Sequence, residues 1–283
     1  MPSFLEQSRK ADSGDLLSIN PRSTRAWLVL AALLFGMLLA VASDASLRSR
    51  VAPALFITLA FALVAWLLRG VTRRGAIAGF LVTSALFIAG GPAMFGAVLL
   101  VFMLTLTATK FRKEQKRALT IAEHSGGRDA AQVFANLAIA SVAAVLGGLT
   151  PLRVPFFVAA LAALAEAACD TVSSETGKAL AREARLITSG RIVRAGTDGA
   201  MSIPGTMLGS VAAVLVGAEA CMTGLLNVPM AMVAVISGIA GMLLDSLLGA
   251  TLQQRGWLTN NGVNLASTGF SALLATLAAW LFA

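Results

Sequence analysis

Residues 153–178 read RVPFFVAALAALAEAACDTVSSETGK, and this stretch decides the fold. After the first residue comes a long apolar run, which predicts a membrane-spanning helix. The same run then carries Glu166, Asp170 and Glu175 before it ends at Lys178. A charged carboxylate at the bilayer centre costs about 2.5–3.5 kcal/mol on insertion scales, so acids in this position indicate a functional site.

The composition of the whole chain is that of a membrane protein. Of its 283 residues, 57% are hydrophobic and only 13% are charged. Soluble domains are about 45–50% apolar and about 25% charged, so a soluble enzyme and a disordered chain are both excluded. The net charge of +8 indicates basic loops that face anionic lipid or bound phosphates, and not nucleic acid. One histidine and two cysteines exclude a zinc site and a disulfide framework.

About nine apolar runs use up most of the chain. They predict an all-α, polytopic transmembrane helix bundle over residues 26–283, preceded by a polar cytoplasmic segment at residues 1–25. Inner loops are expected near residues 110–130, 178–201 and 253–266. The expected spans lie near residues 26–43, 51–68, 76–90, 92–109, 131–149, 153–177, 202–220, 228–252 and 267–283. The third and fourth of these runs share a turn at Gly90-Gly91-Pro92.

The basic residues predict the orientation of these spans. If the N-terminus is cytoplasmic and the helices alternate, all but Arg48, Arg50 and Arg153 of the 22 lysines and arginines fall on inner segments. This asymmetry follows the positive-inside rule and places the C-terminus outside. We therefore expect a multi-pass integral membrane protein, in the cell inner membrane if the source is bacterial.

Two pairs of glycines within the apolar runs fit the pattern G-x-x-x-G. They are Gly75 with Gly79 and Gly205 with Gly209. Small residues at this spacing let the backbones of two transmembrane helices approach closely. We therefore expect both pairs to lie where helices pack together.

Asp170 and Asp245 are expected at the same depth in the membrane. Each lies eight residues before the predicted cytoplasmic end of its helix, at Lys178 and Gln253 respectively. At about 1.5 Å per residue, both carboxylates lie about 12 Å below the inner surface. Mg²⁺ prefers carboxylate oxygens and usually binds together with substrate phosphates. The sequence therefore predicts a Mg²⁺ site made by Asp170 and Asp245 with Glu166.

Residues 182–206 form an arginine- and glycine-rich inner loop. Arginine forks suit phosphate oxygens, and glycine lets backbone N–H groups approach an anion. The loop lacks the G-x-x-x-x-G-K-[ST] pattern and is not a Walker A loop. An orientation signal alone is the alternative explanation of its arginines. The candidate phosphate-binding residues of this loop are Arg191, Arg194, Gly196, Thr197, Asp198, Gly199, Gly205 and Thr206.

A second basic loop covers residues 110–128. It ends in Gly126-Gly127-Arg128 just before an apolar helix, and a helix start of this kind can seat a phosphate. An orientation signal with lipid-headgroup contact remains the alternative. The last inner loop carries asparagines that suit a base, a ribose or a headgroup. The candidate ligand-binding residues of these segments are Lys110, Lys116, Arg128, Asn136 and Asn264.

From about residue 70 onward, these motifs resemble a polytopic membrane family. This family contains the plant phytyl-phosphate kinases and animal transmembrane relatives. The most specific element is Asp170-Thr171-x-x-Ser174-Glu175-x-Gly177. The other matching elements are Gly196-Thr197-Asp198-Gly199 with Gly205-Thr206, Asp245-Ser246-Leu247-Leu248-Gly249-Ala250-Thr251 with Gln253, Lys110 with Lys116, Gly127-Arg128, and Gln132-Val133-x-Ala135-Asn136.

The resemblance implies a Mg²⁺-dependent kinase that uses CTP as phosphoryl donor. The implied acceptor is a membrane isoprenoid monophosphate of the phytyl, geranylgeranyl or farnesyl type. The fold would be distantly similar to dolichol kinase and phosphatidate cytidylyltransferase. One departure bears on the nucleotide, because Arg194-Ala195 stand where the family pattern has prolines. The candidate catalytic residues are Asp170, Glu175, Lys178 and Asp245.

Several alternatives to this kinase stay open. A cytidylyltransferase or a prenol kinase of the same superfamily would use the same residue types. A transporter could instead use the intramembrane acids for ion coupling. Expected partners are the nucleotide, the isoprenoid phosphate and membrane lipids, without nucleic acid, and a homo-oligomer is compatible with the sequence. The prenyl chain length is left open.

Overall fold

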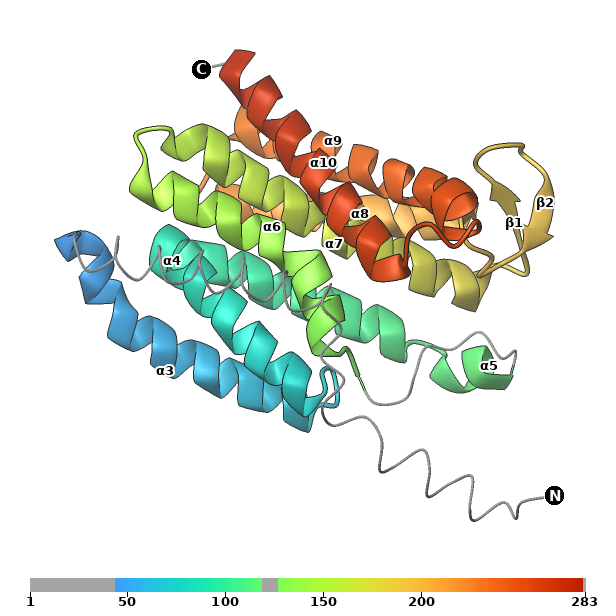
Figure 1. Cartoon of the computed structure of the whole chain (residues 1–283), viewed down its shortest axis with the longest axis horizontal. Helices are drawn as coiled ribbons and strands as arrows, with labels where there is room; N and C mark the ends of the chain where they lie inside the picture. The colour runs from blue at the N-terminus through green and yellow to red at the C-terminus, as the bar shows by residue number, and fades with distance from the viewer. Residues whose placement is uncertain (1–43, 119–126, 282–283) are drawn as a thin grey trace. The chain divides into compact units, whose positions relative to one another are not determined.

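The computed structural model describes residues 44–118 and 127–281 of the chain (Figure 1). The predicted N-terminal segment and the first predicted span, residues 26–43, lie outside the described residues. From Asp44 onward the chain forms one compact unit. Its helices are α3 (Ala45–Leu67), α4 (Arg73–Lys110), α5 (Lys113–Ala118), α6 (Ala130–Leu149), α7 (Arg153–Leu180), α8 (Ile203–Met222), α9 (Val228–Leu248) with the π-turn η1 (Gly249–Gln253), and α10 (Asn260–Leu281).

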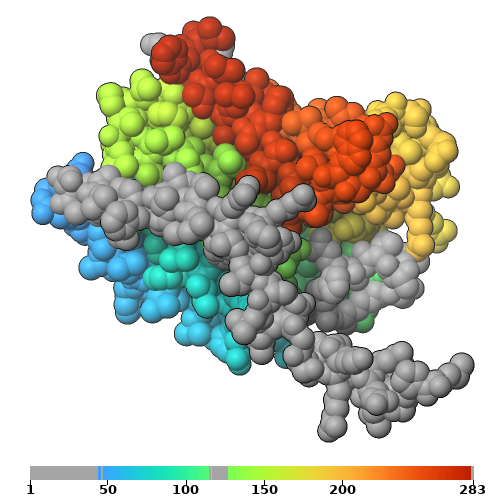
Figure 2. Space-filling view, viewed as in Figure 1, coloured from blue at the N-terminus to red at the C-terminus, as the bar shows by residue number. Residues whose placement is uncertain are grey.

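Helix α7 is the centre of the bundle. It packs against α4, α6, α8, α9 and α10, and every side chain from Phe157 to Cys169 is buried. Most of these residues are alanines, and small side chains let neighbouring membrane helices come close. On the face shown in Figure 2, α6 and α10 lie side by side across this centre. The helix that carries the intramembrane acids is therefore enclosed on several sides.

Helix α4 turns back on itself at Gly91. The backbone there has φ +77° and ψ −169°, which is not helical and favours glycine. The rings of Phe87 and Phe95 lie 5.6 Å apart, although eight residues of continuous helix would separate them by about 12 Å. Arg50 donates to two carbonyl groups at this turn. The turn predicted at Gly90-Gly91-Pro92 is confirmed.

The described residues contain seven helices that are long and apolar enough to cross a membrane. Eight spans were expected in this part of the chain, and the difference lies in α4, which holds two of them on either side of Gly91. The predicted polytopic helix bundle is confirmed in outline. The number of nine spans and the orientation remain predictions.

The inner loop predicted at residues 178–201 contains a small sheet, which corrects the purely helical expectation. Strands β1 (Glu183–Leu186), β2 (Ile192–Arg194) and β3 (Ala200–Met201) pair antiparallel in the order β2-β1-β3. The strands are too short to give a periodic hydrophobic pattern, so the sequence did not indicate them. The last inner loop is also shorter than expected, because α10 already begins at Asn260.

The two glycine pairs behave differently. A Cβ at Gly205 or Gly209 would lie 2.5 Å from a backbone carbonyl oxygen of α7, that of Ser173 or Cys169 respectively. The predicted close packing is confirmed for this pair. Around Gly79, no described atom lies within 4 Å of such a Cβ. The expectation of close packing is therefore wrong for Gly79.

We predict that Gly209→Ala destabilises the protein relative to Gly269→Ala. Both changes improve helix propensity equally, but only the first forces a methyl group against the backbone of α7, which costs about 1–3 kcal/mol. At Gly269 the nearest described atom would be 3.9 Å away. The measurement is the thermal unfolding midpoint of the purified variants in detergent. Equal midpoints would contradict the close approach of α7 and α8.

Candidate functional site

Two adjoining polar cavities lie at one end of the bundle, where the three predicted inner loops meet. The first, here called the acidic cavity, has a volume of about 160 Å³ and is lined by Asp170, Asp198 and Asp245. The second, here called the basic cavity, has a volume of about 920 Å³, and Arg69 and Lys110 are among its lining residues. Figure 1 shows α5, the β1–β2 hairpin and the start of α10 at this end.

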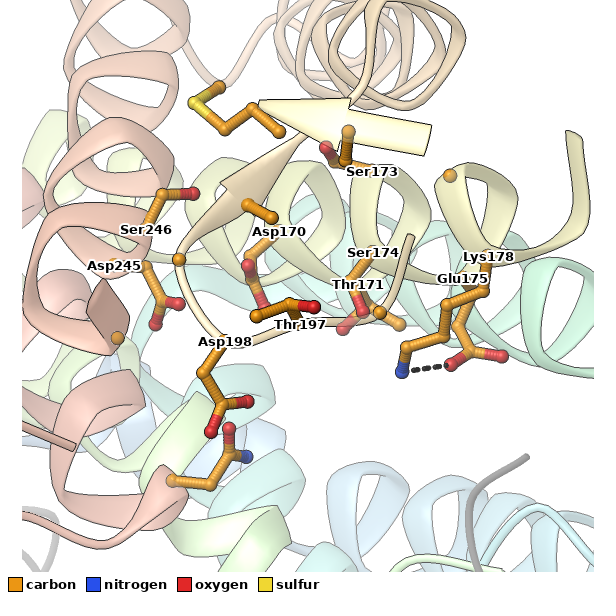
Figure 3. A pocket seen from close by; sticks show the side chains of 18 of the residues that line it. Asp170, Thr171, Ser173, Ser174, Glu175, Lys178, Thr197, Asp198, Asp245 and Ser246 are labelled. Atoms are coloured by element: carbon orange, nitrogen blue, oxygen red, sulfur yellow. Dashed lines mark hydrogen bonds and ion pairs between the residues drawn. The ribbon is translucent and has the colours of Figure 1, made fainter. Parts of the chain in front are cut away.

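The structure brings Asp170 of α7 and Asp245 of α9 together. Figure 3 shows both carboxylates directed into the acidic cavity from different helices. The carboxylate of Asp245 lies close enough to those of Asp170 and Asp198 for each of them to repel it. Such a concentration of negative charge at one point favours a bound cation.

Asp245 is held in place by the first turns of α10. The Ser267 hydroxyl donates to Asp245 Oδ2 over 3.2 Å. In the amide orientation that satisfies its neighbours, Asn264 donates to the same oxygen over 3.2 Å and to the carbonyl of Asn260 over 3.1 Å. Asn264 was expected to bind a base or headgroup, whereas the structure gives it a contact that orients an acidic side chain.

The glycine-rich loop of residues 196–199 forms another wall of the acidic cavity. Gly196 and Gly199 have φ values of +93° and +74°, which favour glycine. A Cβ at Gly199 would overlap Ala250 of η1, so the loop rests directly on the end of α9. The Gln254 side chain donates to the carbonyl of Asp198 over 2.9 Å. These contacts present Thr197 and Asp198 to the cavity, and the phosphate-binding role of both residues stays a prediction.

The acidic cavity fits a magnesium ion that binds with its substrate. Within residues 44–118 and 127–281, no three His, Cys, Asp or Glu side chains form a ready metal cluster. Mg²⁺, however, is usually bound by one or two carboxylates together with water and substrate phosphates. Asp170 and Asp245 supply that number of carboxylates, and Asp198 lies beside them.

Glu166, predicted as the third metal ligand, does not line the acidic cavity. It is 1% exposed, and its Oε1 has no hydrogen-bond partner among the described residues. A Cβ at Gly238 or Gly241 of α9 would meet atoms of Glu166, so α9 packs directly over it. The charge of Glu166 nevertheless acts on those of Asp170 and Asp245, so its role as a metal ligand stays a prediction.

Glu175 is neutralised by two lysines. Its carboxylate, 2% exposed, accepts from Lys116 Nζ over 2.5 Å and from Lys178 Nζ over 3.1 Å. Lys116 also donates to the carbonyls of Ala108 and Thr109 at the end of α4. An ammonium group has three protons, so Lys116 has none left for a phosphate. Lys116 and Glu175 therefore join α4, α5 and α7, which corrects the phosphate-binding role expected of Lys116.

Arg128 lies where the acidic and basic cavities meet, and it lines both. Its guanidinium donates to Thr105 of α4 over 3.0 Å and to Thr171 of α7 over 3.3 Å. Its backbone pairs with the segment before α4, because its N–H donates to Gly70 and its carbonyl accepts from Thr72. The guanidinium is thus fixed between α4 and α7 beside both cavities, and its fork of donors suits a phosphate.

The start of α6 contributes less to anion binding than the sequence suggested. Asp129 and Gln132 form a capping box, in which each side chain accepts from the backbone N–H of the other residue. These two N–H groups are therefore not available for a phosphate. The basic group that faces both cavities here is the guanidinium of Arg128.

Several predicted residues lie away from both cavities. Strand β2 is an edge strand on the far side of β1 from β3. Arg194 at its end and Arg191 just before it are both exposed. Gly205 packs against the backbone of α7. The candidate residues that line neither cavity are Glu166, Arg191, Arg194, Gly205 and Thr206.

The cavities also contain residues that the sequence analysis did not select. Arg69 and Lys113 add positive charge to the basic cavity, and Ser173, Ser246 and Gln253 line the acidic cavity. Arg69 directly follows an apolar run, where a basic residue is first explained as an orientation signal. Ser173 and Ser246 lie within the motifs that resemble the family, so their position in the sequence could have indicated them.

The fold and its cavities define a polytopic helical membrane protein with charged cavities at one end of its bundle. The chain belongs to the integral membrane protein DUF92 family, whose model matches residues 56–272. This confirms the family resemblance expected from the sequence motifs. The protein is a multi-pass integral membrane protein.

Curated relatives come from plants and archaea. Protein VTE6, chloroplastic, of Arabidopsis thaliana is 32% identical over 75% of this chain and 66% of its own length. Protein PGR of the same plant is 32% identical over 72% of this chain and 87% of its own length. A membrane protein of Methanocaldococcus jannaschii, MJ0933, is 38% identical over 41% of this chain and 49% of its own. The chain thus spans just under two thirds of VTE6, and no solved structure matches it.

We predict that Lys116→Met lowers the stability of the protein by about 3–5 kcal/mol, because it leaves the buried Glu175 short of one partner. The double variant Lys116→Met/Glu175→Gln should lose less stability than the sum of its two single variants. The measurement is chemical or thermal unfolding in detergent.

Lys113→Met is the matched control for this cycle, since Lys113 lies in the same short helix and is only half-buried. It should change the stability by no more than about 0.5 kcal/mol. Additive losses in the Lys116 and Glu175 cycle would show that this ion pair does not join the helices.

Proposed function

We propose that the protein transfers the γ-phosphoryl group of CTP to a membrane isoprenoid monophosphate, giving the isoprenoid diphosphate and CDP. The observation that carries this proposal is the acidic cavity of Asp170 and Asp245 adjoining a basic cavity at Arg128. Phosphoryl transfer depends mainly on positioning and on charge stabilisation. A cation site and a phosphate site in contact provide both.

The basic cavity is the proposed nucleotide site. Its volume of about 920 Å³ falls within the range of about 300–1,000 Å³ common for ligand pockets. Arg69, Lys110 and Lys113 would neutralise the triphosphate. Asn260 and Asn261, which line the same cavity, offer hydrogen bonds to a base or ribose.

The reaction needs little proton chemistry from the protein. An oxygen of the acceptor phosphate, already an anion, forms the new bond to the γ-phosphorus. The bond between that phosphorus and the bridging oxygen breaks, and CDP leaves with the electron pair. Bound Mg²⁺ would offset the charge of the phosphate oxygens, and Asp170 and Asp245 would hold it. Arg128, between the cavities, would stabilise the transferring group.

The choice of CTP and of an isoprenoid phosphate is supported by the motif resemblance. The family that these motifs resemble contains the plant phytyl-phosphate kinases. The residues that carry the resemblance most specifically, Asp170, Thr171, Ser174, Glu175 and Gly177, all line the acidic cavity. The departure from the family pattern at Arg194-Ala195 bears on which nucleotide is used.

We also propose nine spans, with the N-terminus inside and the C-terminus outside. The two halves of α4 on either side of Gly91 would each cross the membrane. In support, parts of all three basic or polar loops that were assigned to the inner side line the same pair of cavities. This topology opens the cavities to the cytoplasm, where nucleotides are abundant.

We predict that Asp170→Asn and Asp245→Asn each lower turnover by at least about a hundredfold, since each removes a charge that holds the metal. The assay follows radiolabelled CTP with purified protein, Mg²⁺ and geranylgeranyl or phytyl phosphate, and it identifies the nucleotide product. Chelation of the metal should stop the wild-type reaction.

Each result that contradicts this prediction has a specific interpretation. Normal turnover by a correctly folded Asp170→Asn protein would remove the metal assignment. Release of pyrophosphate instead of CDP would identify a cytidylyltransferase. Nucleotide-independent flux across proteoliposomes, without CTP turnover, would identify a transporter that uses the buried acids.

We further predict that Arg128→Gln lowers kcat/KM by about a hundredfold or more, whereas Arg191→Gln leaves it close to the wild-type value. Of these two arginines only Arg128 lines both cavities, whereas Arg191 is exposed just before the edge strand β2. Arg128→Lys should restore little activity, because an ammonium cannot replace the planar fork of donors. Equal effects at Arg128 and Arg191 would contradict the assignment.

A further inference from the structure

A narrow apolar slot adjoins both cavities at Arg128. It lies between α3, α4 and α6 and has a volume of about 70 Å³. Its walls are mostly hydrocarbon, with contributions from Phe61, Phe102, Val133 and Leu137. The slot is therefore a third space of the site, and it extends from the charged end into the apolar interior of the bundle.

The slot is polar only where it meets the cavities. Arg128, Gln132 and Thr171 line both the slot and the acidic cavity. Farther in, the hydroxyl of Thr83 donates to the carbonyl of Gly79 over 2.7 Å, so it is satisfied within its own helix. A molecule that fits this space has an anionic head at Arg128 and a hydrocarbon tail.

Gly79 leaves an opening in the wall of the slot. A Cβ there would have no described atom within 4 Å, whereas one at Gly75, a turn earlier, would collide with the carbonyl of Arg128. Gly79 is also half-exposed, on a helix long and apolar enough to cross the membrane. Gly79 is therefore a half-exposed position at which the wall of the slot carries no side chain.

We propose that the slot holds the first part of the acceptor's isoprenoid tail and that the opening at Gly79 lets the rest pass into the bilayer. The inference rests on the proposed function, because the phosphate of the acceptor must lie near Arg128. A cavity of about 150 Å³ takes up benzene, so a slot of about 70 Å³ takes only a few carbons. Longer tails must leave it, and Gly79 marks the exit.

The test is Gly79→Leu, which fills the opening without touching the charged residues. Binding of geranylgeranyl phosphate and of dimethylallyl phosphate is measured by thermal shift in detergent, without nucleotide. The long tail should bind the variant at least about tenfold more weakly than the wild type, a loss typical of steric changes in apolar pockets. The short tail should bind both proteins equally.

Gly269→Leu is the matched control, since it adds the same side chain to another helix, where the nearest described atom to a Cβ is 3.9 Å away. Its affinity for both phosphates should equal that of the wild type. If Gly79→Leu binds and phosphorylates both prenyl phosphates as the wild type does, the proposed exit at Gly79 is wrong. The proposed kinase activity is not contradicted by that result. If the wild type neither binds nor phosphorylates any prenyl phosphate, the proposed function itself fails.

A second measurement covers the case in which Gly79→Leu does not fold. Wild-type protein is photolabelled with a prenyl phosphate that carries a diazirine on its second isoprene unit, and the labelled peptide is identified. Label on α3 near Phe61 or on α4 near Gly79 would support the slot. Label confined to α8 or α9 would overturn it.

Discussion

The position of the Arg128 guanidinium constrains the whole charged end of the bundle. It is fixed by hydrogen bonds to Thr105 and Thr171, which come from two different membrane helices. Its backbone pairs with the segment that joins α3 to α4. The acidic cavity, the basic cavity and the apolar slot are all lined by Arg128 and by Gln132, one turn further along the chain. Their relative arrangement therefore depends on contacts made at the start of α6.

The acids of α7 differ in how their charge is compensated. Glu175 is matched by two lysines, and buried ion pairs of this kind hold elements in register at little net gain in stability. Asp170 faces a second acid, Asp245, across an open cavity. Glu166, one turn deeper, is sealed beneath α9. Helix α7 thus carries three acids in different surroundings. Glu175 belongs to a structural ion pair, Asp170 lines a cavity suited to a cation, and Glu166 lies outside the cavities.

The features that sequence predicted well are those fixed by the membrane itself. The length of an apolar run gives a span, and the rise per residue places Asp170 and Asp245 at one depth. The turn at Gly91 was predicted because glycine followed by proline interrupts a helix between two apolar runs.

The features that the sequence did not predict depend on distances between helices. No local pattern shows that Lys116 reaches Glu175, that β2 directs Arg191 away from the cavities, or that α9 covers Glu166. The sequence also treated Gly79 and Gly209 alike, although one faces open space and the other a neighbouring backbone. At each of these positions the residue type indicated a special role, but only the folded structure shows which residue it contacts.

The π-turn η1 ties two walls of the acidic cavity together. Gly199 lies against Ala250 with no room for a side chain, and Gln254 bonds the loop at Asp198. The glycine loop and the end of α9 consequently form one continuous wall, which presents both Asp198 and Asp245 to the acidic cavity. A cation bound between these two acids would contact segments that are already joined to each other.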